Sequence, residues 1–212
     1  MDFSREFLAL AVKKGVLRFG EFKTKAGRLS PYFFNSALFD DGRSFGELCG
    51  YYAQAIRAAG LDYDMLFGPA YKGIPLVAGT AMQLAAQGEN KPFCFNRKEA
   101  KDHGEGGTLV GAPLKGRILV LDDVISAGTS VRESAEIIRS QDAQFAGVVI
   151  ALDRMERGTG EKSAVQEVRD AYDVQVVAVA CLDDLMAFIA DSPTLTEHLV
   201  AVQRYRDTYG VK

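Results

Sequence analysis

Apolar residues along the chain follow two different periods, and the way these periods alternate predicts an α/β fold. Five stretches have the spacing or composition of a helix. They cover residues 4–14, 44–59, 74–86, 130–139 and 163–171. Five shorter runs are nearly all apolar, as expected of strands that are buried on both faces. They cover residues 65–67, 93–95, 117–121, 145–152 and 174–180. Because parallel strands need helical crossovers, this alternation predicts a doubly wound, mostly parallel sheet.

The two ends of the chain depart from this rhythm. Near the N-terminus, aromatic-rich stretches at 16–24 and 31–39 flank the turn sequence KAGR, which predicts a β-hairpin. Near the C-terminus, Thr194 and Glu197 have the spacing of a capping box and predict the start of the last helix. One internal segment, residues 96–107 (NRKEAKDHGEGG), is polar, charged and rich in glycine. We expect a long loop there, and long loops in compact domains are usually functional or disordered.

Composition narrows the picture further. With 212 residues, 48% of them hydrophobic, the chain is long enough to bury a sizeable core. We expect an N-terminal part at 1–60 (helix, hairpin, helix) and an α/β core with C-terminal helices at 61–212, packed as one unit. The net charge of −3 disfavours a nucleic-acid partner or an anionic membrane surface. No apolar run could span a bilayer and no signal peptide is evident, so we expect a cytoplasmic protein.

The three cysteines, Cys49, Cys94 and Cys181, are far apart and have no metal-ligand spacing. We therefore expect buried, reduced thiols rather than a zinc site or disulfides.

The most informative segment is RILVLDDVISAGTS, residues 117–130. An apolar strand ends in Asp122 and Asp123, and a turn of small residues then leads into a helix. Ligands of open α/β sheets bind at the carboxyl ends of strands, and backbone N–H groups at a helix N-terminus can hold a phosphate. The alternative is a simple turn with a helix cap. A cap needs only one acidic residue, so the second aspartate favours a ligand site.

This segment resembles the signature with which type I phosphoribosyltransferases bind 5-phosphoribosyl 1-pyrophosphate (PRPP). The resemblance implies that the acidic pair contacts the ribose hydroxyls and that the loop backbone holds the 5-phosphate. The residues in these roles are Asp122, Asp123, Val124, Ile125, Ser126, Ala127, Gly128, Thr129 and Ser130. It also implies Mg²⁺, held mainly by PRPP and reached by the two aspartates through water. A Walker-type phosphate loop and a dinucleotide-binding GxGxxG turn are both missing from the sequence.

Four further segments, spread over nearly the whole chain, resemble the orotate phosphoribosyltransferases. The turn with Lys25 and the sequence SPYFFN resemble the hood of that family, in which the lysine reaches PRPP while Phe33 and Phe34 frame orotate. Neighbouring strand residues face opposite sides, so at least one of these two rings belongs to the core. Arg154, in LDRMERG, is expected to pair with the orotate carboxylate. Ser126, where many relatives have threonine, keeps the hydroxyl and is assigned to the orotate site as well.

Two other segments correspond to the diphosphate side of the family's site. Gly68–Gly73 resembles the pyrophosphate loop, with Tyr71 and Lys72 at PRPP and a cis peptide expected at Ala70–Tyr71. The polar segment resembles the catalytic loop, which closes over the diphosphate of the neighbouring subunit in a homodimer. Its PRPP-binding cations are Arg97, Lys98, Lys101 and His103. The expected catalytic residues are Lys98, Lys101, His103 and Asp123.

The resemblance implies a type I phosphoribosyltransferase fold with a small N-terminal hood. It implies an enzyme that transfers phosphoribosyl from PRPP to orotate in pyrimidine biosynthesis. Three alternatives stay open at this point: the same chemistry on another base, a non-catalytic PRPP sensor or regulator, and a plain nucleotide-binding module. The hood aromatics and Arg154 disfavour the same chemistry on another base. The cationic loop disfavours both a PRPP sensor and a plain nucleotide-binding module.

Overall fold

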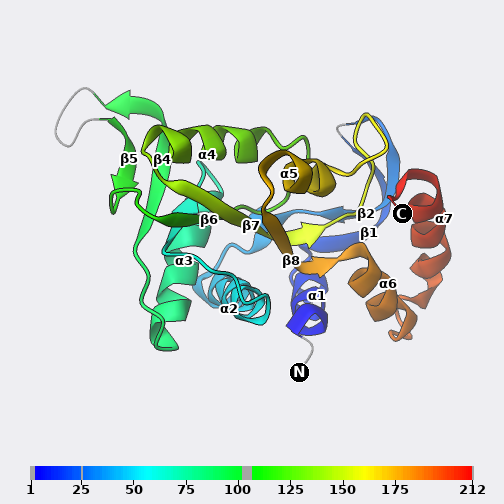
Figure 1. Cartoon of the computed structure of the whole chain (residues 1–212). Coiled ribbons are helices and arrows are strands. Elements are labelled where there is room, and N and C mark those ends of the chain that lie inside the picture. Colours follow the sequence, from blue (N-terminus) through cyan, green and yellow to red (C-terminus); the bar gives the residue numbers. More distant parts are fainter. Residues whose placement is uncertain (1–2, 25, 102–106, 212) are drawn as a thin grey trace.

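The computed structural model of the chain describes residues 3–24, 26–101 and 107–211 and has a six-stranded sheet at its centre (Figure 1). The strand order is β5-β4-β3-β6-β7-β8, and every neighbouring pair is parallel except β4 with β5. The strands are β3 (Met65–Gly68), β4 (Phe93–Lys101), β5 (Gly107–Gly111), β6 (Arg117–Leu121), β7 (Gln144–Asp153) and β8 (Gln175–Cys181). The predicted doubly wound, mostly parallel sheet is confirmed.

Helices cover both faces of this sheet, as Figure 1 shows. One face packs against α1 (Phe3–Lys13), α2 (Gly42–Ala58) and α3 (Gly73–Ala86), and the other against α4 (Thr129–Ser140) and α5 (Ala164–Tyr172). Successive strand residues alternate between the two cores because side chains of a strand point to opposite sides. In β6, for example, Ile118 and Val120 join the core under α4 and α5, whereas Leu119 and Leu121 join the other one.

The N-terminal hairpin packs at one end of the sheet together with the C-terminal helices (Figure 1). It consists of β1 (Leu17–Lys23) and β2 (Leu29–Phe34), which pair antiparallel as predicted. The hairpin is followed by the short 3-10 helix η1 (Ser36–Leu38) instead of a longer second strand. The C-terminal part comprises α6 (Leu182–Ala190), η2 (Thr196–His198) and α7 (Leu199–Tyr209). The main apolar core includes buried residues of this hairpin and of α6 and α7, so the described parts of residues 1–60 and 61–212 share one core.

Two predicted elements were wrong. The segment at 96–107 is not a simple loop, because β4 continues through it to Lys101 and pairs with β5, which the sequence did not reveal. The extension of β4 is mostly polar and has no alternation of apolar and polar residues, so the sequence pattern does not predict a strand there. The capping box at Thr194 does not form either. Its hydroxyl lies 3.3 Å from that of Ser192, and α7 begins at Leu199 after a 3-10 turn.

The topology places two loops side by side at the carboxyl edge of the sheet. Strand β3 lies between β4 and β6, so the chain reverses direction of winding there. The loops after β3 and β6 flank this switch point, where open α/β sheets bind their ligands. No helix in the described part of the chain is long and apolar enough to cross a membrane. All three cysteines are free; Cys49 and Cys94 are buried, and Cys181 is half-buried.

Candidate active site

Asp122 directly follows β6 and is a buried carboxylate with several hydrogen-bond partners. Its backbone carbonyl accepts a 2.7 Å hydrogen bond from the hydroxyl of Tyr52 in α2. Its side chain accepts from Ser130 and from the backbone N–H of Asp123. Burial, which disfavours the charged form, raises the pKa of Asp122 to about 6. An acidic group with this pKa at a strand end is a common mark of a functional site.

Asp123 is the point at which three loops meet. Its Oδ2 accepts a hydrogen bond from Lys72 Nζ at 2.6 Å and one from Ser36 Oγ at 2.6 Å. Lys72 comes from the loop after β3, and Ser36 comes from the 3-10 helix after the hairpin. The Asp123 side chain is only 11% exposed, whereas that of Lys72 is 54% exposed. The carboxylate is therefore fixed in place, while the lysine has room to move.

The turn between β6 and α4 has the shape of a phosphate cradle. Gly128 adopts φ +69° and α4 begins directly after it, at Thr129, so the helix N-terminus opens onto the turn. Ser126, Ala127 and Thr129 are exposed, which leaves this turn accessible to a ligand. Arg132, one turn into α4, donates a 2.8 Å hydrogen bond to the carbonyl of Ala127. The predicted loop is therefore a turn that is open to a ligand, and the guanidinium of Arg132 contacts its backbone.

The loop after β3 is packed too tightly to accept side chains at its glycines. A Cβ on Gly68 would lie 2.1 Å from the carbonyl oxygen of Gly73, and one on Gly73 would lie 2.9 Å from that of Leu121. The peptide bond between Ala70 and Tyr71 is cis, as predicted. The Ala70 N–H donates to Asn96 Oδ1 at 2.8 Å, and this contact joins the loop to β4. The Tyr71 side chain is exposed beside it.

The cations of the polar segment are only partly described. Lys98 forms an exposed ion pair with Glu133 of α4, at 3.2 Å. The Nη1 atom of Arg97 is buried and has no hydrogen-bond partner in the described part of the chain. Lys25 and His103 lie outside the described residues, as does the side chain of Lys101, whose backbone ends β4. Their predicted roles therefore stay predictions.

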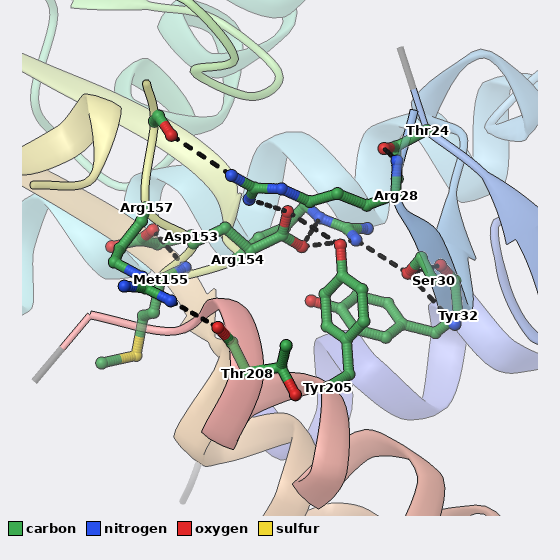
Figure 2. Close-up of polar contacts among 12 residues, drawn as sticks. Thr24, Arg28, Ser30, Tyr32, Asp153, Arg154, Met155, Arg157, Tyr205 and Thr208 are labelled. Carbon is green, nitrogen blue, oxygen red and sulfur yellow. Dashed lines mark hydrogen bonds and ion pairs between the residues drawn. The ribbon is translucent and has the colours of Figure 1, made fainter. Parts of the chain in front are cut away.

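Arg154 lies in a cluster of polar side chains shown in Figure 2. Its guanidinium lies over the ring of Tyr32, 4.2 Å from the centroid, and donates to Ser30 Oγ at 2.9 Å. Its Nε donates to a carboxylate oxygen of Glu156 at 2.7 Å. Although burial disfavours the charged form, these neighbours raise the pKa of Arg154. The guanidinium is thus permanently charged and held in one orientation.

The two hood phenylalanines point in opposite directions, as strand alternation predicts. Phe34 packs against Phe7 of α1 in the core, with ring centroids 6.2 Å apart. Phe33 is 38% exposed and stacks on Phe22 of β1 at 5.4 Å, with the guanidinium of Arg18 5.7 Å from its centroid. The two rings therefore do not form the two sides of one slot.

The residues of the site fit Mg²⁺ that is carried by a phosphate ligand. Among the described residues, no group of three or more His, Cys, Asp or Glu side chains could hold a metal ion. Asp122 and Asp123 supply two carboxylates, and the second already binds Lys72. Mg²⁺ prefers to keep several waters and is usually held by one or two carboxylates together with substrate phosphates. This donor set matches that pattern.

Several contacts in the site could not be found from the sequence. Ser36 is 87 residues from Asp123 in the chain, and Ser30 is 124 residues from Arg154. Nothing in a single serine marks it as the partner of a distant charge, because serine is common in turns. Glu156 lies within the segment LDRMERG, so its closeness to Arg154 was visible in the sequence but its contact was not.

Known proteins resemble this chain along its full length. The phosphoribosyl transferase domain family matches residues 36–184. Orotate phosphoribosyltransferase of Laribacter hongkongensis is 63% identical over 211 residues, which cover 100% of this chain and 99% of that relative. The orotate phosphoribosyltransferase of Chromobacterium violaceum is also 63% identical, over 99% of this chain and 98% of that relative.

A solved structure agrees with this sequence likeness. The crystal structure of orotate phosphoribosyltransferase from Francisella tularensis has a TM-score of 0.89 at 38% identity, and covers 97% of this chain and 99% of that chain. The fold, the two loops at the switch point and these relatives agree with one another. The chain therefore belongs to the phosphoribosyltransferase family, and within it to the orotate phosphoribosyltransferases.

Proposed function

We propose that this protein transfers the phosphoribosyl group of PRPP to orotate, giving orotidine 5'-monophosphate and diphosphate in pyrimidine biosynthesis. The observation that carries the proposal is the 63% identity to an orotate phosphoribosyltransferase over the whole chain. In the reaction, the bond between the anomeric carbon and a diphosphate oxygen breaks, and a ring nitrogen of orotate bonds to that carbon.

The ribose and its 5-phosphate fit the region around β6. Asp122 and Asp123 are hydrogen-bond acceptors for the ribose hydroxyls, and the exposed turn before Thr129 offers backbone N–H groups to the phosphate. Ser36 holds the Asp123 carboxylate before any ligand arrives, so this acceptor is already oriented for binding. This region supports a phosphorylated sugar more directly than any other part of the described chain.

The diphosphate fits the loop after β3. Lys72 lies within reach of Asp123, and its exposed side chain can exchange that carboxylate for a diphosphate oxygen. The buried Nη1 of Arg97 is a second donor without a partner in the described residues. Mg²⁺, when bound with PRPP, neutralises charge on the leaving diphosphate. We assign Lys98, Lys101 and His103 to the same task, because charge that develops in the transition state is best met by fixed cations.

Orotate differs from uracil by a carboxylate, and Arg154 is the charged group proposed to recognise it. The guanidinium is charged and fixed, and its planar fork suits a carboxylate. We assign Ser126, in the exposed turn, to the same site. Phe33 and Phe34 are assigned through the backbone between them, because their rings point to opposite sides.

We further propose that the protein is a cytoplasmic homodimer in which the arm of β4 and β5 serves the neighbouring active site. The arm is the outer edge of the sheet, at the end opposite the C-terminal helices (Figure 1). Lys98 lies on β4 in this arm and is exposed, so its charge is suited to contact an anionic ligand on another subunit.

A base panel tests the reaction. The protein is incubated with PRPP, Mg²⁺ and one of orotate, uracil, hypoxanthine or adenine, and the nucleotide product is identified by mass spectrometry. We expect orotidine 5'-monophosphate and no product from the other bases. A product from a purine or from uracil would contradict the assignment of Arg154, and binding of PRPP without any product would favour a PRPP sensor.

A further inference from the structure

Glu156 contacts two guanidinium groups, those of Arg154 and Arg28. One of its carboxylate oxygens, Oε1, contacts Arg154 Nε at 2.7 Å and Nη2 at 2.6 Å. The other, Oε2, lies 3.6 Å from Nη1 of Arg28, which directly precedes β2. The three side chains are between 16% and 23% exposed, so water screens them only weakly. Two positive charges and one negative charge leave a surplus of one positive charge, which matches a singly charged carboxylate on a ligand.

The C-terminal helix α7 supplies the remaining donor to this carboxylate. The hydroxyl of Tyr205 donates to Glu156 Oε2 at 3.1 Å, and Tyr205 itself is only 5% exposed. Its ring packs edge-on against that of Tyr32, with centroids 6.4 Å apart, and Tyr32 in turn lies under the guanidinium of Arg154. Figure 2 shows these side chains converging from the hairpin, from the segment after β7 and from α7.

The end of α7 also holds the backbone of the segment that carries Arg154. The N–H of Arg157 donates to the carbonyl of Tyr209 at 2.8 Å, and the N–H of Val211 donates to the carbonyl of Met155 at 2.8 Å. A β-bridge joins Glu156 to Gly210. Met155 has φ +51°, a conformation that non-glycine residues rarely adopt, so these neighbours hold the segment in an unusual path.

We propose that Glu156 and Tyr205 are positioning residues of the base site, through which α7 sets the orientation of Arg154 and hence the affinity for an anionic base. Glu156 holds the guanidinium edge, and Tyr205 holds Glu156. Neither residue needs to touch the substrate. The inference rests on the proposed function, because Arg154 is the group assigned to the orotate carboxylate.

Tyr205→Phe is the sharpest test, because it keeps the ring and the charge balance and removes one hydrogen bond to a carboxylate. We expect the KM for orotate to rise about three- to tenfold, which is less than the full effect of a lost hydrogen bond to a charged group, because the change reaches orotate only through Glu156 and Arg154. The kcat and the KM for PRPP should stay within about twofold of wild type, because Asp123, which is proposed to bind PRPP, contacts Ser36 and Lys72 and not Tyr205 or Glu156. Tyr172→Phe is the matched control: its hydroxyl makes no hydrogen bond in the described part of the chain, and its ring contacts Phe145 and Arg139 instead of the cluster. It should leave every parameter unchanged.

A double-mutant cycle shows whether the effect passes through Glu156. In a Glu156→Ala background, Tyr205→Phe should cause no further rise in the KM for orotate. An unchanged KM for orotate in Tyr205→Phe, or equal rises for orotate and PRPP, would overturn the inference.

Two further measurements separate this inference from the proposed function. Wild type and Arg154→Ala are assayed first. If wild type does not use orotate, the proposed function and this inference both fail. If Arg154→Ala loses orotate affinity but Tyr205→Phe does not, only the positioning role fails.

Discussion

The contact between Ser36 and Asp123 gives a prediction that can be worked out in numbers. Ser36→Ala removes a 2.6 Å hydrogen bond to a carboxylate that is only 11% exposed. A hydrogen bond to a charged group contributes about 1.5–3 kcal/mol, and we take the lower end because Lys72 still contacts the same oxygen. About 1.5 kcal/mol corresponds to roughly a tenfold loss of affinity. The loss should appear in PRPP binding, because Ser36 holds the carboxylate that is proposed to accept from the ribose hydroxyls.

Isothermal titration calorimetry with two ligands locates this effect. PRPP with Mg²⁺ should bind Ser36→Ala about tenfold more weakly than wild type. Diphosphate with Mg²⁺ has no ribose hydroxyls to meet Asp123, so its affinity should not change. Ser140→Ala is the control, because that hydroxyl contacts Ile137 and Gln141 at the end of its own helix. Equal PRPP affinity in Ser36→Ala and wild type would refute the reasoning, and so would a matching loss of diphosphate affinity.

Three further predictions follow from the same geometry. Arg154→Ala should raise the KM for orotate at least tenfold and spare PRPP, as for a lost charge-assisted contact; steady-state kinetics with equal losses for both substrates would contradict it. Because burial raises the pKa of Asp122 from 3.8 to about 6, the fold loses stability as pH rises between these values. Asp122→Asn should therefore raise the free energy of unfolding by up to about 3 kcal/mol at pH 7.5 but not at pH 4. The variant should also bind PRPP more weakly. Thermal unfolding that shows the same gain in stability at both pH values would exclude this explanation. Gly73→Ala would place a Cβ 2.6 Å from the nearest side chain and should lower the free energy of unfolding by about 1–3 kcal/mol. Gly42→Ala is the control, because a Cβ at Gly42 would meet no atom within 4 Å, and its stability should not change. Equal melting temperatures of the two variants would contradict the tight packing at Gly73.

The sheet was predictable because strands that are buried on both faces have nearly continuous apolar sequences. The strand at 117–121 was predicted with its observed bounds, since RILVL is apolar and flanked by a turn and two aspartates. Helix α4 was found within one residue at each end because Gly128 marks its start. Strand β5 and the extension of β4 were missed. Their sequences, NRKEAK and GTLVG, have no continuous apolar run or clear period, and only pairing with a neighbouring strand makes them strands.

The site was predictable where one segment carries the chemistry. The acidic pair and the turn after it are continuous in the sequence, and so is the segment around Arg154. The contacts that hold these groups come from distant segments and depend on the fold. Ser36 reaches Asp123 across 87 residues, and Tyr205 reaches Glu156 across 49. Such partners cannot be assigned before the topology is known, because many serines and tyrosines have the same local sequence character.

Transfer of phosphoribosyl to orotate is tested most directly by a continuous absorbance assay of orotate with the purified protein. We expect a loss of orotate signal that requires both PRPP and Mg²⁺, and a return of the signal when excess diphosphate is added to the product. Uracil in place of orotate should give no change. Orotate that stays unconsumed with PRPP and Mg²⁺ present, or uracil consumed at a similar rate, would show that the protein does not carry out this transfer.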